Sequence, residues 1–261
     1  MMIFNMFDAQ IAGSLRARCQ DVPLRIGVNA TVIPARSGLG SSGHYTFLKA
    51  GENQDSFCAR CGEWWACLAG EIAITLPDNT TQLLQRGGVF SPQVGAQHQL
   101  KVLSDATLLR AEFDDITDTS TSLLFNYFDS FSAGHTVDWT GGLNLGVSSR
   151  FIAKSDGLGS SATFTSMIEG EDPDWAARLN YKHVEWCASF QGTLKVAWFD
   201  KQQQRERIAW VQPGMAYAPG VDEDHEISAF QSVVGLVCCF RPALDNLAVQ
   251  HDLTGSVASS Y

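Results

Sequence analysis

Residues 37–42 read Ser-Gly-Leu-Gly-Ser-Ser, and residues 156–161 read Asp-Gly-Leu-Gly-Ser-Ser, an offset of 119. The pair Glu63-Trp64, with Gly70 seven residues after the glutamate, recurs as Glu185-Trp186 with Gly192. A third set recurs at an offset of 127: Gly87, Pro92, His98 and Phe113 match Gly214, Pro219, His225 and Phe240. Landmarks that keep their order through half of the chain indicate an internal duplication, with two similar domains in succession.

The segments between these landmarks have the composition of short strands. Residues 71–76, 194–198 and 233–238 are alternating or continuous apolar runs bounded by Gly, Pro, Asn or Asp. Such runs are typical of strands, and no stretch shows a long helical periodicity. The sequence therefore predicts an all-β protein made of two tandem domains.

The domain limits follow from the extent of the repeat. We expect a first domain at 1–116, a connector at 117–149 and a second domain at 150–261. The connector is rich in Ser, Thr, Gly and Asp, which is typical of loops. Within it, residues 123–128 form an apolar run that predicts either a short helix or an extra strand.

Composition narrows the function classes. The chain has 261 residues, with 28 acidic against 18 basic side chains and a net charge of -10. This balance argues against a nucleic-acid partner, which requires clustered positive charge. No apolar run reaches the length of about 20 residues that a membrane helix needs. The N-terminal segment has an acidic residue where a secretion signal is positively charged, so we expect a cytoplasmic protein with a small-molecule partner. We expect most of the seven cysteines to be buried thiols.

The second half carries a recognisable constellation of side chains. Glu185-x6-Gly192 is followed by Pro213-Gly214-x4-Pro219 and then by His225. This spacing resembles the two motifs of cupins, which are small antiparallel jelly-roll barrels. A carboxylate and an imidazole directed into such a barrel predict a divalent metal site. The resemblance thus makes the fold class two tandem cupin domains.

From about residue 150 to 255, the chain resembles the ectoine synthase family of single-domain cupin cyclases. The segments that carry the resemblance occur in the family's order: 154–159, 183–185, 213–218, 224–225, 237–244 and 251–252. By this resemblance, Glu185, Tyr217 and His225 hold an iron ion. We expect Fe(II), with Zn, Mn or Co as alternatives because the ligand set mixes hard and borderline donors.

The resemblance also assigns residues to substrate and catalysis. The substrate-binding candidates are Arg150, Thr165, Phe240 and Pro242, to which we add Trp186, although tryptophan is more often a core residue. The catalytic candidates are His183, Tyr217 and His251. The implied reaction is an intramolecular condensation of an amino-acid-derived substrate, in which water leaves and a small nitrogen ring closes. This is a cyclase of the carbon–oxygen hydro-lyase type.

Departures from the family keep other functions open. Val249 stands where the family has a tail glutamate, and Tyr181 lies one position away from a family aromatic. One alternative is another metal-dependent cupin, such as a dimethylsulfoniopropionate lyase or a non-heme iron oxygenase. Those proteins usually carry His-x-His before the glutamate, whereas this chain offers only His183. The other alternative is a bicupin that binds a small molecule without chemistry.

The first half retains only part of the constellation. Glu63 and His98 are present, but Phe90 stands at the tyrosine position and cannot ligate a metal. We therefore expect a degenerate metal site in a structural barrel or pocket wall. The competing interpretation is a zinc site that joins Cys58 and Cys61 to Glu63 and His98. Because the family pairs single barrels, two barrels in one chain predict either a pseudo-dimeric monomer or a homodimer.

Overall fold

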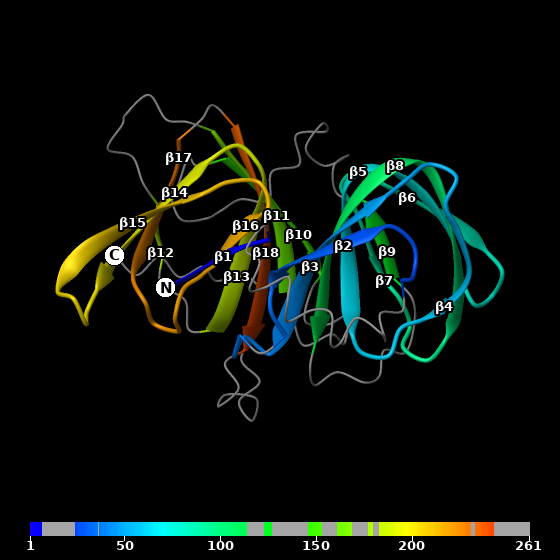
Figure 1. Cartoon of the computed structure of the whole chain (residues 1–261), viewed down its shortest axis with the longest axis horizontal. Helices are drawn as coiled ribbons and strands as arrows, with labels where there is room; N and C mark the ends of the chain where they lie inside the picture. The colour runs from blue at the N-terminus through cyan, green and yellow to red at the C-terminus, as the bar shows by residue number, and fades with distance from the viewer. Residues whose placement is uncertain are drawn as a thin grey trace. The chain divides into compact units, whose positions relative to one another are not determined.

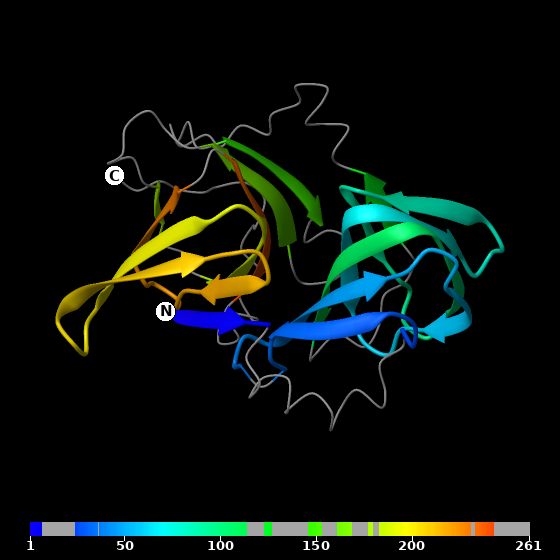
Figure 2. The same ribbon diagram turned by 45° about the horizontal axis from the view of Figure 1, so that its top comes forward.

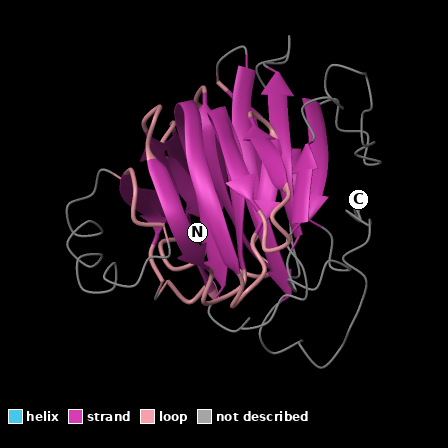
Figure 3. Ribbon diagram, turned by 90° about the vertical axis from the view of Figure 1, so that its right-hand side faces the viewer, coloured by secondary structure: helices cyan, strands magenta, loops and turns pink. Residues whose placement is uncertain are grey.

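The computed structural model describes residues 1–6, 24–35, 37–113, 123–126, 146–152, 161–168, 177–179, 183–230 and 233–242. These residues form strands and loops without a helix, which confirms the predicted all-β class (Figure 3). The chain divides into two compact units (Figure 1). We call Met6–Ala133 the first barrel, and Met1–Asn5 with Gly134–Tyr261 the second barrel. No helix in the described part is long and apolar enough to cross a membrane.

The first barrel is one eight-stranded antiparallel sheet. Its path runs β2-β3-β8-β5-β7-β9, with β4 added on β8 and β6 on β5. The strands are β2 (Val28–Ile33), β3 (Ser41–Leu48), β4 (Asn53–Cys58), β5 (Glu63–Thr75), β6 (Thr81–Gln85), β7 (Gly88–Ser91), β8 (Gln97–Phe113) and β9 (Leu123–Asn126). The long strands β5 and β8 pair over most of their length, with register shifts near residues 67–72. Such bulges bend a sheet so that it can close around a core.

The second barrel consists of two sheets. One has the order β1-β16-β13-β18-β11-β10 and the other β12-β17-β14-β15. The strands are β1 (Met2–Asn5), β10 (Gly146–Ile152), β11 (Ser161–Ile168), β12 (Ala177–Leu179), β13 (His183–Gln191), β14 (Leu194–Asp200), β15 (Arg205–Val211), β16 (Met215–Ala218), β17 (His225–Ala229) and β18 (Val233–Pro242). Its core includes Leu194, Val196, Val211, Ile227 and Leu236. The predicted strands at 194–198 and 233–238 are confirmed.

The glycines of the repeat have a conformational reason. Gly70 and Gly192 have φ values of 83° and 71°, which side chains other than glycine rarely adopt. A Cβ at Gly70 would also lie 2.2 Å from the carbonyl oxygen of Asp105. In each barrel, the glycine of the Glu-x6-Gly spacing is therefore at a position where the backbone needs a positive φ value.

In each barrel, a short strand pairs with the strand that contains Phe90 in the first barrel and Tyr217 in the second. In the first barrel, β9 pairs with β7 and places Leu124 opposite Phe90. In the second barrel, β1 pairs with β16 and places Ile3 opposite Tyr217 (Figure 2). The two strands are therefore equivalent, and each half of the chain gives its leading strand to the other half's barrel.

This exchange differs from the expected domain limits. The segment Met1–Asn5 lies in the second barrel rather than with 1–116, and β9 belongs to the first barrel rather than to a connector. Residues 123–126 form the extra strand that was one of two expectations for this apolar run. The sequence signal is the dipeptide Phe-Asn at 4–5 and again at 125–126, so the repeat begins earlier in each half than the landmarks indicated.

Candidate metal centre

Glu185 lies in the interior of the second barrel. It follows His183 and Val184 at the start of β13, and its side chain is only 1% exposed. Its Oε2 atom has no hydrogen-bond partner among the described residues. Burial raises the pKa of this carboxyl group well above its ordinary value, since no nearby donor compensates for lost water. A buried carboxylate with a free oxygen is suited to a cation.

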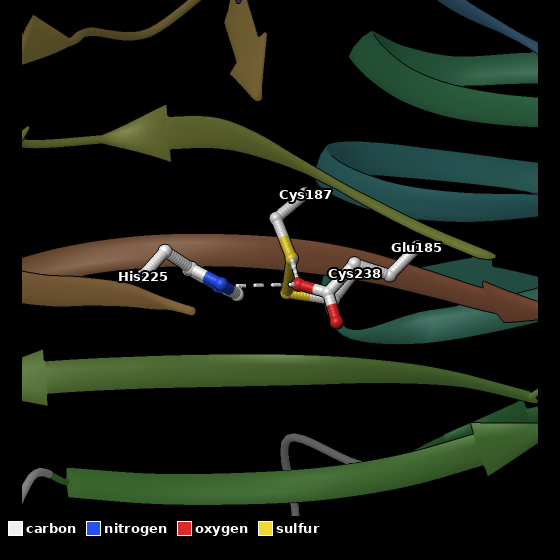
Figure 4. The surroundings of a disulfide bond; sticks show 4 residues. All are labelled: Glu185, Cys187, His225 and Cys238. Carbon is white, nitrogen blue, oxygen red and sulfur yellow. Dashed lines mark hydrogen bonds and ion pairs between the residues drawn. A yellow bond between two sulfur atoms is a disulfide. The ribbon is translucent and has the colours of Figure 1, made fainter. Parts of the chain in front are cut away.

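His225 faces this carboxylate from the opposite sheet. It is the first residue of β17 and is 2% exposed, and its Nε2 atom lies 3.8 Å from Glu185 Oε1 (Figure 4). Its Nδ1 atom is 3.1 Å from the backbone carbonyl of Glu223, which can only accept, so Nδ1 carries the proton and donates. Burial lowers the pKa of His225 and favours the neutral ring. The Nε2 lone pair and the carboxylate oxygen then face each other, an arrangement that a cation between them would stabilise.

Tyr217 completes the cluster. It lies on β16, is 1% exposed, and its ring centroid is 5.9 Å from that of His225. No group of three His, Cys, Asp or Glu side chains within the described residues is placed to hold a metal ion. The phenol of Tyr217, whose ring packs against the imidazole of His225, is the candidate for a third protein ligand beside Glu185 and His225.

The backbone register places several other predicted residues near this cluster. One row across the sheet joins Arg150, Thr163, Cys238, Cys187 and Tyr217 on five successive strands. In the next rows, Phe240 pairs with Glu185 and Pro242 pairs with His183. Thr165 lies on β11 opposite Leu236, two rows from Phe240.

Two predicted residues are not brought to the cluster by the described structure. Trp186 is buried next to Glu185 on β13, but successive strand residues point to opposite faces of a sheet. Its indole therefore lies on the face away from the carboxylate. His251 lies outside the described residues.

Two cysteines at the centre of this row were not singled out by the sequence. Cys187 and Cys238 are directly opposite each other on β13 and β18 and are joined by a disulfide bond (Figure 4). This pair is an exception to the expectation that most of the cysteines are thiols, whereas Cys58, Cys61, Cys67 and Cys239 form no disulfide bond. The Cys187 Sγ atom lies 3.9 Å from Glu185 Oε1.

The first barrel holds an ion pair at the matching position. Glu63 is fully buried and accepts hydrogen bonds from Arg110 Nη2 at 2.8 Å and from Trp65 Nε1 at 2.7 Å. Arg110 also donates to Glu112 at 2.8 Å, and its guanidinium lies 5.3 Å from the centre of the Trp65 ring. Burial alone lowers the pKa of Arg110, but the two carboxylates raise it above its ordinary value, so the charge persists.

The register shows which residues of the two barrels are equivalent. Trp65 is opposite Arg110 and Phe90 in the first barrel, as Cys187 is opposite Cys238 and Tyr217 in the second. By the same register, Phe240 corresponds to Glu112, opposite Glu63, rather than to Phe113 one residue later. The disulfide therefore takes the place of the Trp65–Arg110 pair.

The proposed zinc ligands of the first barrel are engaged elsewhere. His98 packs against the rings of Phe57 and Phe90, with centroids 5.0 and 5.7 Å away, and its Nδ1 donates to the carbonyl of Ala96. Glu63 is held by Arg110, and within residues 37–113 no group of three potential metal ligands is close enough to bind an ion. The described structure does not form the alternative site around Cys58 and Cys61.

Comparison with known proteins gives separate results for the second half and for the whole chain. Residues 142–260 match the family model described as ectoine synthase. The L-ectoine synthases of Bordetella parapertussis and Bordetella bronchiseptica are each 28% identical to this chain over 115 residues, covering 43% of this chain and 79% of theirs. The second half is thus an ectoine synthase-like cupin.

Solved structures match the chain over both halves. An oxalate decarboxylase structure described by its substrate binding mode matches with a TM-score of 0.62 and 12% identity, covering 93% of this chain and 77% of that one. The formate complex of the Lactobacillus farciminis oxalate decarboxylase has a TM-score of 0.62 and 15% identity, covering 94% and 87% of the two chains. At these identities the likeness shows the fold, which is that of two tandem cupin domains.

Proposed function

We propose that the second barrel is a metal-dependent cyclase of the hydro-lyase type, which acts on a small amino-acid-derived substrate in the cytoplasm. The reaction is an intramolecular condensation in which an amine attacks an amide or related carbonyl, water leaves and a nitrogen ring closes. The observation that carries this proposal is the convergence of buried Glu185, Tyr217 and His225 inside an ectoine synthase-like barrel.

The three residues fit a divalent ion. Glu185 has a buried oxygen without a donor among the described residues, and the Nε2 lone pair of His225 faces the same carboxylate. Carboxylate, imidazole and phenolate together suit Fe(II), with Zn, Mn and Co as alternatives. When bound, the ion would supply Lewis acidity toward a carbonyl oxygen.

The protein's own contribution is to position the substrate and to remove a proton. The apolar residues around Tyr217 and Cys187 exclude water, which strengthens polar interactions inside the barrel. Holding amine and carbonyl together in a curled substrate removes several kcal/mol from the barrier, on the order of the effect of other intramolecular reactions. Arg150 is the candidate to bind a substrate carboxylate, because a guanidinium pairs with both of its oxygens.

The remaining candidates have roles that depend on their place in the sheet. His183 begins β13, two residues before Glu185, and is the candidate base for the amine proton. His251 is the second candidate base. Thr165, Phe240 and Pro242 are the candidates to contact the substrate, whereas the position of Trp186 on the other face of β13 assigns it to packing.

For the first barrel we propose a structural role without a metal. The guanidinium of Arg110 already supplies the positive charge that Glu63 requires, and Phe90 has no hydroxyl at the position of Tyr217. The chain then contains two unequal barrels, which favours a pseudo-dimeric monomer, with a homodimer as the alternative.

Metal content per chain tests the proposal directly. After anaerobic purification, elemental analysis is expected to find about one metal ion per chain in the wild type. Tyr217→Phe should lose it, whereas Tyr45→Phe, which removes a buried phenol from the first barrel, should retain it. N-acylated diamino acids are then screened by mass spectrometry for loss of one water. Metal content that does not change in Tyr217→Phe would show that the ligand set is wrong.

A further inference from the structure

The Cys187–Cys238 pair lies in the interior of the second barrel beside the candidate metal centre. The two residues are 51 positions apart in sequence but directly opposite in the register of β13 and β18. Both are buried, with exposed fractions of 2% and 5%. Figure 4 shows the disulfide beside the carboxylate of Glu185, which the ring of His225 faces.

Donor atoms around this point have the spacing of metal ligands. His225 Nε2 and Cys187 Sγ lie 3.8 and 3.9 Å from the same oxygen, Glu185 Oε1. Nitrogen, oxygen and sulphur bound tetrahedrally to one ion at ordinary bond lengths are about 3.3 to 3.5 Å apart. The two distances to Glu185 Oε1 are therefore within about 1 Å of those between ligands of one ion, provided that the sulphur can act as a ligand.

The redox state of the pair decides whether the sulphur is available. A disulfide sulphur is neutral, has no proton to donate and is a poor ligand, whereas a cysteine thiolate is a strong one. In the disulfide form, no group of three His, Cys, Asp or Glu side chains in the described part of the chain is placed to hold a metal ion. A disulfide in a cytosolic protein is usually transient, catalytic or redox-sensing.

We propose that Cys187 is a redox-controlled ligand of the metal centre, available when the Cys187–Cys238 bond is open and withdrawn when it is closed. The inference rests on the proposed function, because it concerns the same metal centre. A dithiol opens the S–S bond: two electrons and two protons pass to the cysteine sulphurs, and the dithiol becomes a cyclic disulfide. A small-molecule disulfide such as glutathione disulfide reverses the step by thiol–disulfide exchange.

The first barrel shows that side chains at these two positions control the neighbouring glutamate. Trp65 and Arg110 occupy the positions of Cys187 and Cys238, and both donate hydrogen bonds to Glu63. In the second barrel, Cys187 at the Trp65 position likewise lies 3.9 Å from the carboxylate, and it is bonded to Cys238 at the Arg110 position. The two positions supply a permanent cation and an indole donor in the first barrel, and in the second they supply sulphur whose chemistry can change.

Cobalt(II) binding tests the proposal, since a thiolate ligand gives cobalt a near-ultraviolet charge-transfer absorption. Wild-type protein is prepared in two forms, one treated with glutathione disulfide and one with dithiothreitol, and both are desalted without oxygen. The reduced form is expected to bind cobalt about tenfold or more tightly than the oxidised form and to show the absorption. Thiol alkylation followed by mass spectrometry establishes the state of the pair in each sample.

Three single variants make the result specific. Cys238→Ser leaves Cys187 without its partner, so it should bind cobalt like the reduced wild type after either treatment. Cys187→Ser should bind weakly and lack the absorption after either treatment. Cys239→Ser removes a buried cysteine that forms no disulfide bond. Cys239 is next to Cys238 and points to the other face of β18, so this variant should keep the wild-type response.

The outcomes separate this inference from the proposed function. Equal cobalt affinity in the two wild-type forms, without the thiolate absorption, would overturn the role of Cys187, while loss of cobalt in Tyr217→Phe would still support the proposed centre. No cobalt binding in either form would overturn both. The redox control would also be overturned if alkylation in denaturant showed that the bond stays closed after dithiothreitol treatment of the folded protein, or that it never closes.

Discussion

Replacing Arg110 with methionine is expected to destabilise the first barrel strongly. The change removes the guanidinium that lies 2.8 Å from Glu63 Oε2 and leaves a fully buried carboxylate that retains only the Trp65 donor. At an effective dielectric constant of about 20, unit charges at this distance attract by about 6 kcal/mol before the cost of desolvation. Breaking a buried pair from one side typically costs about 3 to 5 kcal/mol in the free energy of unfolding.

Guanidinium chloride denaturation, followed by tryptophan fluorescence, measures this loss. For a domain of this size, a change of 3 to 5 kcal/mol lowers the midpoint of the affected transition by about 1 M. Arg86→Met, at an exposed position of the same barrel, serves as the control and should change the unfolding free energy by less than about 0.5 kcal/mol.

A double variant isolates the charge from the loss of packing. Glu63→Gln combined with Arg110→Met removes both charges, and it should recover most of the stability that Arg110→Met alone loses. Stability of Arg110→Met within about 1 kcal/mol of the wild type would refute the reasoning. A double variant as unstable as the single one would do the same, because packing rather than charge would then explain the loss.

The other predictions concern the metal centre, His98 and His44. Single replacements of Glu185 or His225 by alanine, or of Tyr217 by phenylalanine, should abolish metal binding and turnover while circular dichroism still shows the β fold; full metal content in all three would contradict the site. His98→Ala should lower thermal stability through the lost contacts with two aromatic rings but leave the turnover number unchanged, and loss of turnover without unfolding would assign the first barrel to catalysis. Burial, aided by Arg110, lowers the pKa of His44 to about 3 from 6.5, so the folded state stays neutral where the unfolded chain binds a proton. Stability from this group is present above about pH 6.5 and is lost as the pH falls toward 3, which amounts to about 2 kcal/mol between pH 7 and 5. Urea denaturation at both pH values should show this extra loss in the wild type but not in His44→Gln, and equal losses would count against it.

The sequence predicted the features of the fold that depend on local rules. Strands were visible as apolar runs, and the repeated glycines marked positions that need positive φ, as Gly70 and Gly192 show. The exchange of β1 and β9 was not predicted, because a four-residue strand does not specify its partner. That choice depends on pairing between segments more than 100 residues apart, such as Ile3 with Tyr217.

The candidate site was predictable only where residues belong to a motif. Glu185, Tyr217 and His225 occur at spacings that resemble a known family, and the structure brings these three together. The disulfide was missed because Cys187 and Cys238 become neighbours only through the register of two strands, and a register cannot be read from spacing alone. Arg110 was missed although it interrupts the apolar run at 108–111, where a charge signals a buried partner.

The two barrels differ most in chemistry at three equivalent positions around one retained glutamate. Phenylalanine, tryptophan and arginine surround Glu63, while tyrosine and two cysteines surround Glu185. A buried carboxylate must be neutralised, and a chain can do this with a side-chain cation, a proton or a metal ion. The first barrel uses a side-chain cation, which is always present and therefore inert. In the second barrel, no described lysine or arginine pairs with Glu185, so the carboxylate remains available for an ion that can also bind substrate. The side chains at these three positions therefore give the retained glutamate an ion-pair role in the first barrel and, in the function proposed above, a metal-binding role in the second.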